Sequence, residues 1–385
     1  MSVWDDLVGQ EPVVATLRHA ARAAQERREG GPGRGMTHAW LFTGPPGSGR
    51  SNAARAFAAA LQSDDVGEAD TPELRTALTG SHPDVTLVRT DQLTIGVREI
   101  RDHVRGAAMR PAGGKWQVLV VEDADRLTEE AADALLKSLE EPPPRTVWML
   151  CAPTAEDVIV TIRSRCRQVV LRTPPAHAVA EMLTRREGVP EALALSAARA
   201  AQGHVGRARA LATDESVRAR RSTILHLPSS LTSLGACMTA AQRVHEAAEE
   251  NAGEVAARAE ESELRDLRTS WGIEERGKRP VGYQGALSQL EKEHKRRRTR
   301  MVRDSVDGVL LDLLSFYRDV LATQQSPATE LVNAEAAADV HAMARQGTPE
   351  QTLRSLESIL ACREALTANA APLLALESLM LSLKR

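Results

Sequence analysis

A run of eight residues, Gly44-Pro45-Pro46-Gly47-Ser48-Gly49-Arg50-Ser51, constrains this chain more than any other part of its sequence. The short apolar run His38–Thr43 precedes it, and the alanine-rich, helix-like stretch Ser51–Leu61 follows it. Between a strand and a helix, a glycine-rich turn lets backbone N–H groups close around phosphate oxygens at the positive end of the helix. The sequence therefore predicts a phosphate-binding loop (P-loop). The alternative is a glycine-rich turn that holds no ligand.

Two positions bear on what such a loop could do. Arg50 stands where this motif usually has lysine, and arginine keeps the charge but replaces a compact ammonium by a larger fork. Ser51 stands in the position whose hydroxyl binds magnesium. These residues predict the fold of a P-loop, whereas hydrolysis is not expected.

A second candidate element is the apolar run Val118–Val121, which ends in Glu122 and Asp123. In P-loop enzymes a buried strand ends in acidic residues that hold magnesium and polarise water. ATPases of the AAA+ class have Asp before Glu, and here the order is reversed, so the catalytic position is one methylene shorter. We expect water to be poorly oriented there. The alternative is that the two acids only cap a buried strand.

Strand and helix signals alternate over residues 1–175. Apolar runs predict strands and amphipathic stretches predict helices, and near-continuous apolar runs are typical of a parallel sheet covered on both faces. We therefore predict an α/β domain that ends near Thr173-Pro174-Pro175. The remaining predicted strands are Asp84–Arg89, Trp116–Val121, Arg145–Ala152 and Arg167–Leu171, and the predicted helices include Pro12–Arg28 and Thr128–Glu140.

Strand signals stop after residue 175. Residues 176–213 predict a small helical domain, because short helical stretches are separated by Gly188-Val189-Pro190 and Gly203. Residues 214–385 look helical throughout, with an apolar-stripe helix at Val306–Leu321.

The charge and the aromatic content argue against a protein that binds nucleic acid by itself, and the charges of residues 246–303 allow two interpretations. The formal net charge of −3 is too even for binding nucleic acid by bulk positive charge, and 3% aromatic residues are too few for a channel that stacks single-stranded bases. Residues 246–275 nevertheless carry a net −7 and residues 276–303 a net +8, with a Gly/Pro turn at 277–282 between them. We favour a helical hairpin whose charges face each other at about 246–303; the alternative is a basic arm that binds phosphate.

The cysteines and the apolar runs indicate the compartment. Cys151, Cys166, Cys237 and Cys362 lie far apart, without metal-ligand spacing or a disulfide framework. The first residues lack a signal peptide, and the apolar runs are too short to cross a bilayer. We expect a cytoplasmic protein without membrane partners.

Several motifs together resemble one family. They are Val8-Gly9-Gln10, the run from His38 to Gly47, Ser81-His82-Pro83-Asp84, the run from Ala134 to Pro143 (ALLKSLEEPP), and Thr161-Ile162-Arg163-Ser164-Arg165-Cys166. The last two are highly specific at this spacing. Residues 1–210 resemble the bacterial clamp-loader subunits of DNA polymerase III, which are AAA+ proteins, and most of all those of the delta-prime type. The helical remainder resembles them only in outline.

The resemblance implies an architecture and partners. It implies a RecA-like AAA+ domain at 1–175, a three-helix lid at 176–213, and a helical collar domain at 214–385. The collar would join a hetero-pentamer with gamma/tau-type motor subunits and a delta-type subunit. The assembled complex would act on the sliding clamp and on primed-template DNA.

The resemblance also implies site residues. Arg165 would be an arginine finger that reaches in trans into a neighbouring subunit's ATP site and neutralises charge on the γ-phosphate. The alternative for Arg165 is a surface arginine beside a strand. ATP or ADP with magnesium would lie at a weak or vestigial site formed by Val8, Gly44, Pro45, Gly47, Ser48, Gly49, Arg50, Ser51, Glu122 and Asp123.

Departures from the family pattern separate two functions. Ala152-Pro153 stands where a polar sensor is expected, and Gly206 stands where a second sensor arginine is expected, with Arg207 one place off. We therefore expect a delta-prime-like stator, needed for clamp loading, that lends Arg165 and does not hydrolyse ATP itself. The alternative is an active AAA+ ATPase, either a loader motor subunit or a related DNA-remodelling ATPase.

A zinc module common in the family has no cysteines here to form it. The corresponding span, residues 63–82, contains scattered acids and one histidine, which we interpret as a solvated loop. We predict no zinc. The residues in question are Asp64, Asp65, Glu68, Asp70 and His82.

Overall fold

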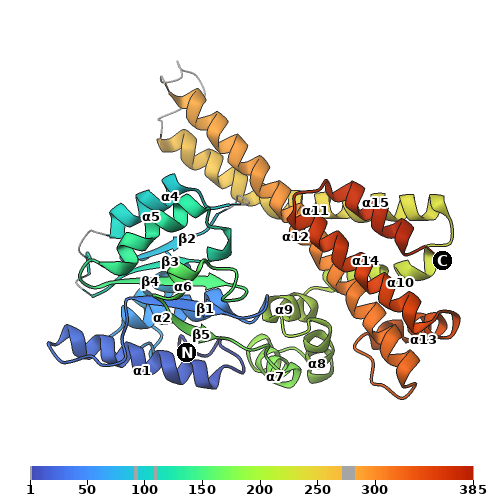
Figure 1. Cartoon of the computed structure of the whole chain (residues 1–385), viewed down its shortest axis with the longest axis horizontal. Helices are drawn as coiled ribbons and strands as arrows, with labels where there is room; N and C mark the ends of the chain where they lie inside the picture. The colour runs from blue at the N-terminus through green and yellow to red at the C-terminus, as the bar shows by residue number, and fades with distance from the viewer. Residues whose placement is uncertain (1, 91–93, 108–110, 114, 271–281, 385) are drawn as a thin grey trace. The chain divides into compact units, whose positions relative to one another are not determined.

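The computed structural model describes residues 2–90, 94–107, 111–113, 115–270 and 282–384. The chain divides into two compact units, Met1–Thr213 and Asp214–Arg385, which are described separately below. Figure 1 shows the elements of each unit, and their labels are used from here on.

The first unit contains a five-stranded, entirely parallel sheet with the order β2-β3-β4-β1-β5. The predicted α/β class is confirmed, and each strand begins within one residue of its predicted start. The strands are β1 (Ala39–Thr43), β2 (Val85–Val88), β3 (Gln117–Val121), β4 (Thr146–Ala152) and β5 (Arg167–Val170).

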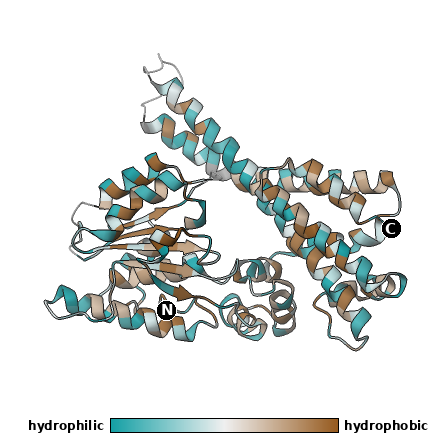
Figure 2. Cartoon of the chain, viewed as in Figure 1, coloured by the Kyte–Doolittle hydropathy of each residue, from teal (hydrophilic) through white to brown (hydrophobic). Residues whose placement is uncertain are grey.

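Helices cover both faces of this sheet (Figure 1). Successive side chains of β1 point to opposite faces, so Trp40 and Phe42 pack in one core and Leu41 in the other. The first core contains α1 (Glu11–Arg28), α2 (Arg50–Leu61) and α3 (Pro72–Thr79); the second contains α4 (Val97–Ala107) and α5 (Glu129–Glu140). The strands accordingly stand out as the hydrophobic layer of the unit (Figure 2). Two short elements, η1 (Ala124–Arg126) and α6 (Val160–Arg163), lie in the connections.

Three helices follow the last strand within the same unit: α7 (Ala176–Glu187), α8 (Glu191–Ala200) and α9 (Val205–Thr213). Their buried residues are mostly small, which allows close packing of short helices. The predicted fold class, in which a small set of helices follows the α/β sheet, is therefore confirmed.

The second unit is helical in its described part. Its elements are α10 (Glu215–Ser230), α11 (Leu234–Ser270), α12 (Tyr283–Gln325), η2 (Ala334–Ala336), α13 (Ala337–Gln346), α14 (Pro349–Thr367) and α15 (Pro372–Ser382). The predicted helix at 306–321 was wrong in extent, because it is only the second half of α12. No proline interrupts α12, and only Gly285 and Gly308, which a helix tolerates, lie inside it.

The first part of α12 and the second part of α11 form a charged hairpin (Figure 1). Alanines at 248, 252 and 256 are buried along α11, and farther out the acids of α11 meet the bases of α12. Glu260 accepts a hydrogen bond from Arg298 Nε at 2.8 Å, and Glu263 contacts His294 at 2.7 Å and Arg297 at 2.8 Å. The outer part of the hairpin is correspondingly hydrophilic (Figure 2).

Part of the predicted charge blocks lies outside the described residues. These are Glu274, Glu275, Arg276, Lys278, Arg279 and nearly all of the predicted turn at 277–282, and the side chain of Arg258 is not described either.

A buried polar network ties the second unit together. Arg221 of α10, only 5% exposed, donates to Asp312 Oδ1 at 2.9 Å and also contacts Glu335 and Asn333. Asn333 in turn donates to Asp319 at 2.8 Å. Because buried charges need partners, this network fixes how α10 and the 333–335 segment pack on α12.

No helix among the described residues combines the length and the apolar character that a membrane span requires.

Candidate functional site

The glycine-rich run forms a loop between β1 and α2. Gly47 and Gly49 have φ of 80° and 93°, a conformation that residues with side chains rarely adopt, and Gly49 caps α2. The N–H of Gly44 donates to the carbonyl of Pro153 at 3.0 Å, and the N–H of Ser48 donates to the carbonyl of Pro45 at 3.1 Å. The loop thus has the strand–turn–helix setting of a P-loop, with Pro45 and Pro46 in its first half.

The side chains of the loop are turned inward. Arg50 donates from Nη1 to the carbonyl oxygen of Gly44 at 2.7 Å, so its guanidinium lies on the loop's own backbone. Ser48 is 3% exposed, and its hydroxyl has no hydrogen-bond partner among the described residues. Ser51 is half-buried in the first turn of α2. A buried, unpartnered hydroxyl in such a loop is available to a bound oxygen atom.

The two acids follow β3 at the same edge of the sheet. The N–H of Glu122 donates to the carbonyl of Val88 at 3.1 Å, and the carbonyl of Asp123 accepts from the N–H of Arg126 at 3.0 Å. The carboxylate of Glu122 accepts from Arg55 Nε at 2.7 Å and lies 2.9 Å from Arg89 Nε. Two arginines from α2 and from the end of β2 therefore hold this acid.

The P-loop and the acids share one environment around Cys151 of β4. Burial raises the pKa of the Cys151 thiol, the negative charges of Glu122 and Asp123 raise it further, and the positive charges of Arg50 and Arg55 oppose them. The structure therefore brings the predicted residues Arg50, Glu122 and Asp123 together at the carboxyl edge of the sheet.

The predicted sensor positions lie beside the same loop. Ala152 is buried at the end of β4, and Pro153 offers the loop only its carbonyl. Neither has a side chain that could orient a water molecule.

The loop that enters α9 packs on the P-loop. A β-carbon built on Gly47 would lie 2.5 Å from the α-carbon of His204, so the two α-carbons are within about 4 Å of each other. His204 Nδ1 accepts from the N–H of Arg207 at 3.2 Å. Burial and the charge of Arg207 lower the pKa of His204. His204 therefore packs directly on Gly47 of the P-loop at the start of α9.

The N-terminal segment lies on the exit of β5. Gln10 is buried, and its side chain donates to the carbonyl of Arg172 at 2.6 Å and accepts from the N–H of Arg172 at 3.2 Å. Val8, the predicted nucleotide contact in this segment, is half-buried two residues earlier. Gln10 therefore ties the segment that carries Val8 to the chain just after β5.

Arg165 lies at the other edge of the sheet from the P-loop. It precedes β5, whereas the P-loop follows β1, and these two strands are parallel neighbours with Trp40 opposite Arg167. The length of β1, five residues, separates the two edges by about 16 Å. Arg165 is 37% exposed, donates to the carbonyl of Thr161 at 2.7 Å and forms an ion pair with Glu140 at the end of α5. The predicted finger and the predicted phosphate loop are therefore not part of one site in this chain.

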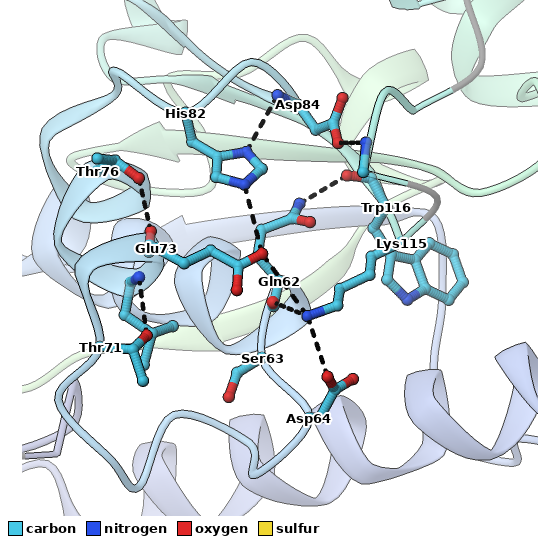
Figure 3. A network of polar contacts seen from close by, with 12 residues as sticks. Gln62, Ser63, Asp64, Thr71, Glu73, Thr76, His82, Asp84, Lys115 and Trp116 are labelled. Carbon is cyan, nitrogen blue, oxygen red and sulfur yellow. Dashed lines mark hydrogen bonds and ion pairs between the residues drawn. The ribbon is translucent and has the colours of Figure 1, made fainter.

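The span that we interpreted as a solvated loop is one over residues 63–71, where Asp64, Asp65, Glu68 and Asp70 are exposed, but the interpretation was wrong for α3 and for the buried His82 (Figure 3). His82 is buried, and its Nδ1 accepts from the N–H of Asp84 at 3.1 Å. Lys115 donates to the carbonyl of Gln62 at 2.6 Å and lies 3.3 Å from Asp64 and 3.6 Å from Glu73.

The other acids of this span also have partners. Glu68 pairs with Arg18 at 3.0 Å, Asp70 pairs with Arg75 at 2.8 Å, and Asp65 accepts from the N–H of Ala69 at 2.7 Å. Among the described residues, no three side chains of His, Cys, Asp or Glu are grouped to hold a metal ion.

Sequence reasoning missed five residues of these sites: Arg55, Arg89, Lys115, Glu140 and His204. Only Arg55 could have been noticed in the sequence, because it is a charged residue inside an alanine-rich helix, four positions after Ser51. The partners of the other four come from distant parts of the chain, or from the backbone of a loop, and left no pattern in the sequence.

Comparison with known proteins gives two family matches. Residues 31–175 match the family described as DNA polymerase III, delta subunit, and residues 303–385 match that described as DNA polymerase III, delta subunit, C terminal. The residues between 176 and 302, which include the lid and most of the charged hairpin, lie outside both matches.

Three curated relatives are similar to part of the chain. The DNA polymerase III subunit delta' of Escherichia coli is 34% identical over 40% of this chain and 47% of its own length. The corresponding subunit of Pseudomonas aeruginosa is 35% identical over 41% and 52%, and the subunit tau of Bacillus subtilis is 29% identical over 50% and 35%. The chain thus spans about a third to a half of the length of these relatives.

Proposed function

This chain belongs to the AAA+ family of bacterial DNA polymerase III clamp-loader subunits, and from that premise we propose that it is a stator of the delta-prime type. In this role it supplies Arg165 to the ATP site of a neighbouring motor subunit and does not hydrolyse ATP itself. It is needed, as part of the assembled loader, to place the sliding clamp on primed DNA.

The position of Arg165 carries the proposal. A guanidinium at the opposite edge of the sheet from the P-loop cannot reach a phosphate held by that loop, because β1 separates the two by about 16 Å. Its side chain is partly exposed and therefore accessible to another subunit. A planar cation of this kind stabilises the charge that develops on a transferred γ-phosphoryl group.

Two features of the chain's own P-loop site support the absence of hydrolysis. Arg50 is bonded to the carbonyl of Gly44, and Ala152 and Pro153 stand where a polar side chain would orient water. We propose that the loop, with Ser48 and Ser51, is a residual site for ATP or ADP that binds weakly and does not turn over.

The second unit suits a role in assembly. Four leucines on α14 and α15 are 40–65% exposed: Leu353, Leu360, Leu374 and Leu381. Within each helix they are seven residues apart, so each pair lies on one face of its helix. We propose that this unit is a collar domain and joins gamma/tau-type motor subunits and a delta-type subunit in a hetero-pentamer.

An active ATPase is the second candidate. The backbone of the P-loop is complete and Ser51 is present, and the chain is also similar to a tau subunit. A loader motor subunit, or a related DNA-remodelling ATPase, would share these features.

Turnover by the isolated chain separates the two candidates. The stator proposal predicts no ATP hydrolysis above that of a control protein, with or without primed DNA. Steady turnover that Arg50→Ala abolishes would establish the ATPase instead. Reconstitution with gamma/tau-type and delta-type subunits, followed by mass measurement of the complex, tests the proposed assembly.

A further inference from the structure

Two arginines contact the carboxylate of Glu122, which stands in the position that binds magnesium in an AAA+ ATP site. Arg55, on α2, donates from Nε to Glu122 Oε1 at 2.7 Å and contacts the same oxygen through Nη2. Arg89, directly after β2, lies with Nε 2.9 Å from Glu122 Oε2. Both oxygens of the carboxylate therefore already have a positively charged partner.

The surroundings strengthen this arrangement. The side chain of Glu122 is 13% exposed and that of Arg55 is 23% exposed, so solvent screens their charges less than at an open surface. The three residues come from α2, the end of β2 and the end of β3, and the pairing Val88–Val121 fixes the two strand ends side by side. The contact is thus built into the sheet.

Magnesium does not fit this set of groups. Mg²⁺ requires oxygen ligands at about 2.0–2.1 Å, usually one or two carboxylates, in a near-octahedral arrangement. At Glu122 two guanidiniums already surround the carboxylate, and a divalent cation brought there would be repelled by both. Moving Arg55 away would separate two largely buried charges, whereas Arg89, 49% exposed, adds its charge from the solvent side.

We infer that Arg55 and Arg89 take the place of the metal at Glu122, so that this site excludes divalent cations. The inference deepens the proposed function, because it gives a physical reason why the P-loop does not support hydrolysis. Under this inference the ligand that suits the loop is a nucleoside polyphosphate free of metal, rather than one bound with magnesium. Arg55 and Arg89 are positioning residues here, since they act through Glu122.

Direct binding of Mn²⁺ to the whole chain tests this inference without nucleotide, partner or turnover. Electron paramagnetic resonance measures free Mn²⁺ in titrations of the wild type, of Glu122→Gln, of Arg55→Gln/Arg89→Gln, and of this double variant with Glu122→Gln added. A matched control is Arg75→Gln, which breaks the exposed pair with Asp70 in the same unit. Circular dichroism establishes that each variant is folded.

We expect no Mn²⁺ site in the wild type or in Arg75→Gln, and a gain of one site in the double variant that adding Glu122→Gln abolishes. A wild-type site that is lost in Glu122→Gln would overturn the inference. A folded double variant that gains no site would also overturn it, because the arginines would then not be what excludes the metal.

A second measurement applies if the double variant folds poorly. Thermal melting of the single variant Arg89→Gln is compared in Mg²⁺ and in NaCl of equal ionic strength. A rise of melting temperature specific to Mg²⁺ in the variant supports the inference, and the same rise in the wild type contradicts it. Failure of Arg165 to act in trans would overturn the proposed function and leave these results unaffected.

Discussion

Arg165 and Glu140 form an ion pair at the edge of the sheet opposite the P-loop. Glu140 is the last residue of α5, and Arg165 lies between α6 and β5, where its guanidinium also bonds the carbonyl of Thr161 at 2.7 Å. The pair holds the guanidinium at the surface of the isolated chain. In the proposed loader, Arg165 leaves this carboxylate and contacts the γ-phosphate of the ATP bound by a neighbouring subunit.

The ion pair itself contributes little to folding. Both side chains are more than a third exposed, and such pairs stabilise a protein by about 0–1 kcal/mol. We expect Glu140→Gln to lower the free energy of unfolding of the isolated chain by less than about 1 kcal/mol, as measured by urea denaturation. A loss of several kcal/mol would show that Glu140 has a structural role.

The contact between Gly47 and His204 is expected to be sensitive to one methyl group. Gly47→Ala places a β-carbon 2.5 Å from the α-carbon of His204, in a backbone conformation with φ of 80°. Gly188→Ala is the matched control, because Gly188 has φ of 67° and open space around it.

We expect Gly188→Ala to cost about 1–2 kcal/mol from backbone strain alone, and Gly47→Ala to cost roughly 1–3 kcal/mol more. Urea denaturation of the whole chain measures both. Equal costs would mean that the start of α9 does not press on the P-loop in solution.

The charged hairpin is expected to lose stability in acid. The hydrogen bond from Arg298 lowers the pKa of Glu260. Burial raises the pKa of Glu263, but Arg297 and His294 outweigh it, and the net shift is downward. Because these pKa values are depressed in the folded state, the stabilisation is present above the ordinary glutamate value of 4.5 and is lost as the pH falls through the folded values.

The variant Glu260→Gln tests this dependence. At neutral pH it should cost about 1 kcal/mol relative to the wild type, and the difference should shrink as the pH falls below the ordinary glutamate value of 4.5 and through the depressed pKa of Glu260. Helical circular dichroism during urea denaturation at several pH values measures it. A difference that stays constant until the hairpin itself unfolds in acid would exclude the pairing with Arg298 as its cause.

The buried network of the second unit is expected to be costly to break. Arg221→Met leaves Asp312, which is 7% exposed, without its guanidinium, and should lower the free energy of unfolding by roughly 3–5 kcal/mol. The double variant Arg221→Met/Asp312→Leu should cost less than the sum of the single variants, because each single variant removes the same contact between these two side chains. Strict additivity in urea denaturation would contradict a direct coupling.

Local pattern was enough to predict the sheet. Runs such as Val118–Val121 are apolar throughout because helices cover both faces of a parallel sheet, and the strands lie within a residue or two of their predicted bounds. The P-loop was also predictable from local pattern, because its glycines must occupy fixed positions between the strand and the helix. The extent of α12 could not be predicted in this way. Its apolar stripe covers only 306–321, and the helix continues into the charged hairpin, where this stripe is absent.

Long-range polar contacts were beyond the sequence. Nothing in the spacing of Arg55, Arg89 and Glu122 indicates that a parallel pairing of β2 and β3 brings them together. In the same way His82 is buried although its neighbours are polar, since Lys115 and Glu73 come from elsewhere in the chain to form its network (Figure 3). A polar segment is solvated only when the fold brings no partner to it.

ATP hydrolysis by the reconstituted loader tests the central claim most directly. The complex contains gamma/tau-type and delta-type subunits with either the wild-type chain or Arg165→Ala, and its mass establishes that it is assembled. We predict that Arg165→Ala lowers the rate at the adjoining motor site by about 10³-fold while the complex stays intact, and that Arg163→Ala, a neighbouring arginine, has little effect. An assembled Arg165→Ala complex with the full ATPase rate at that site would contradict the account.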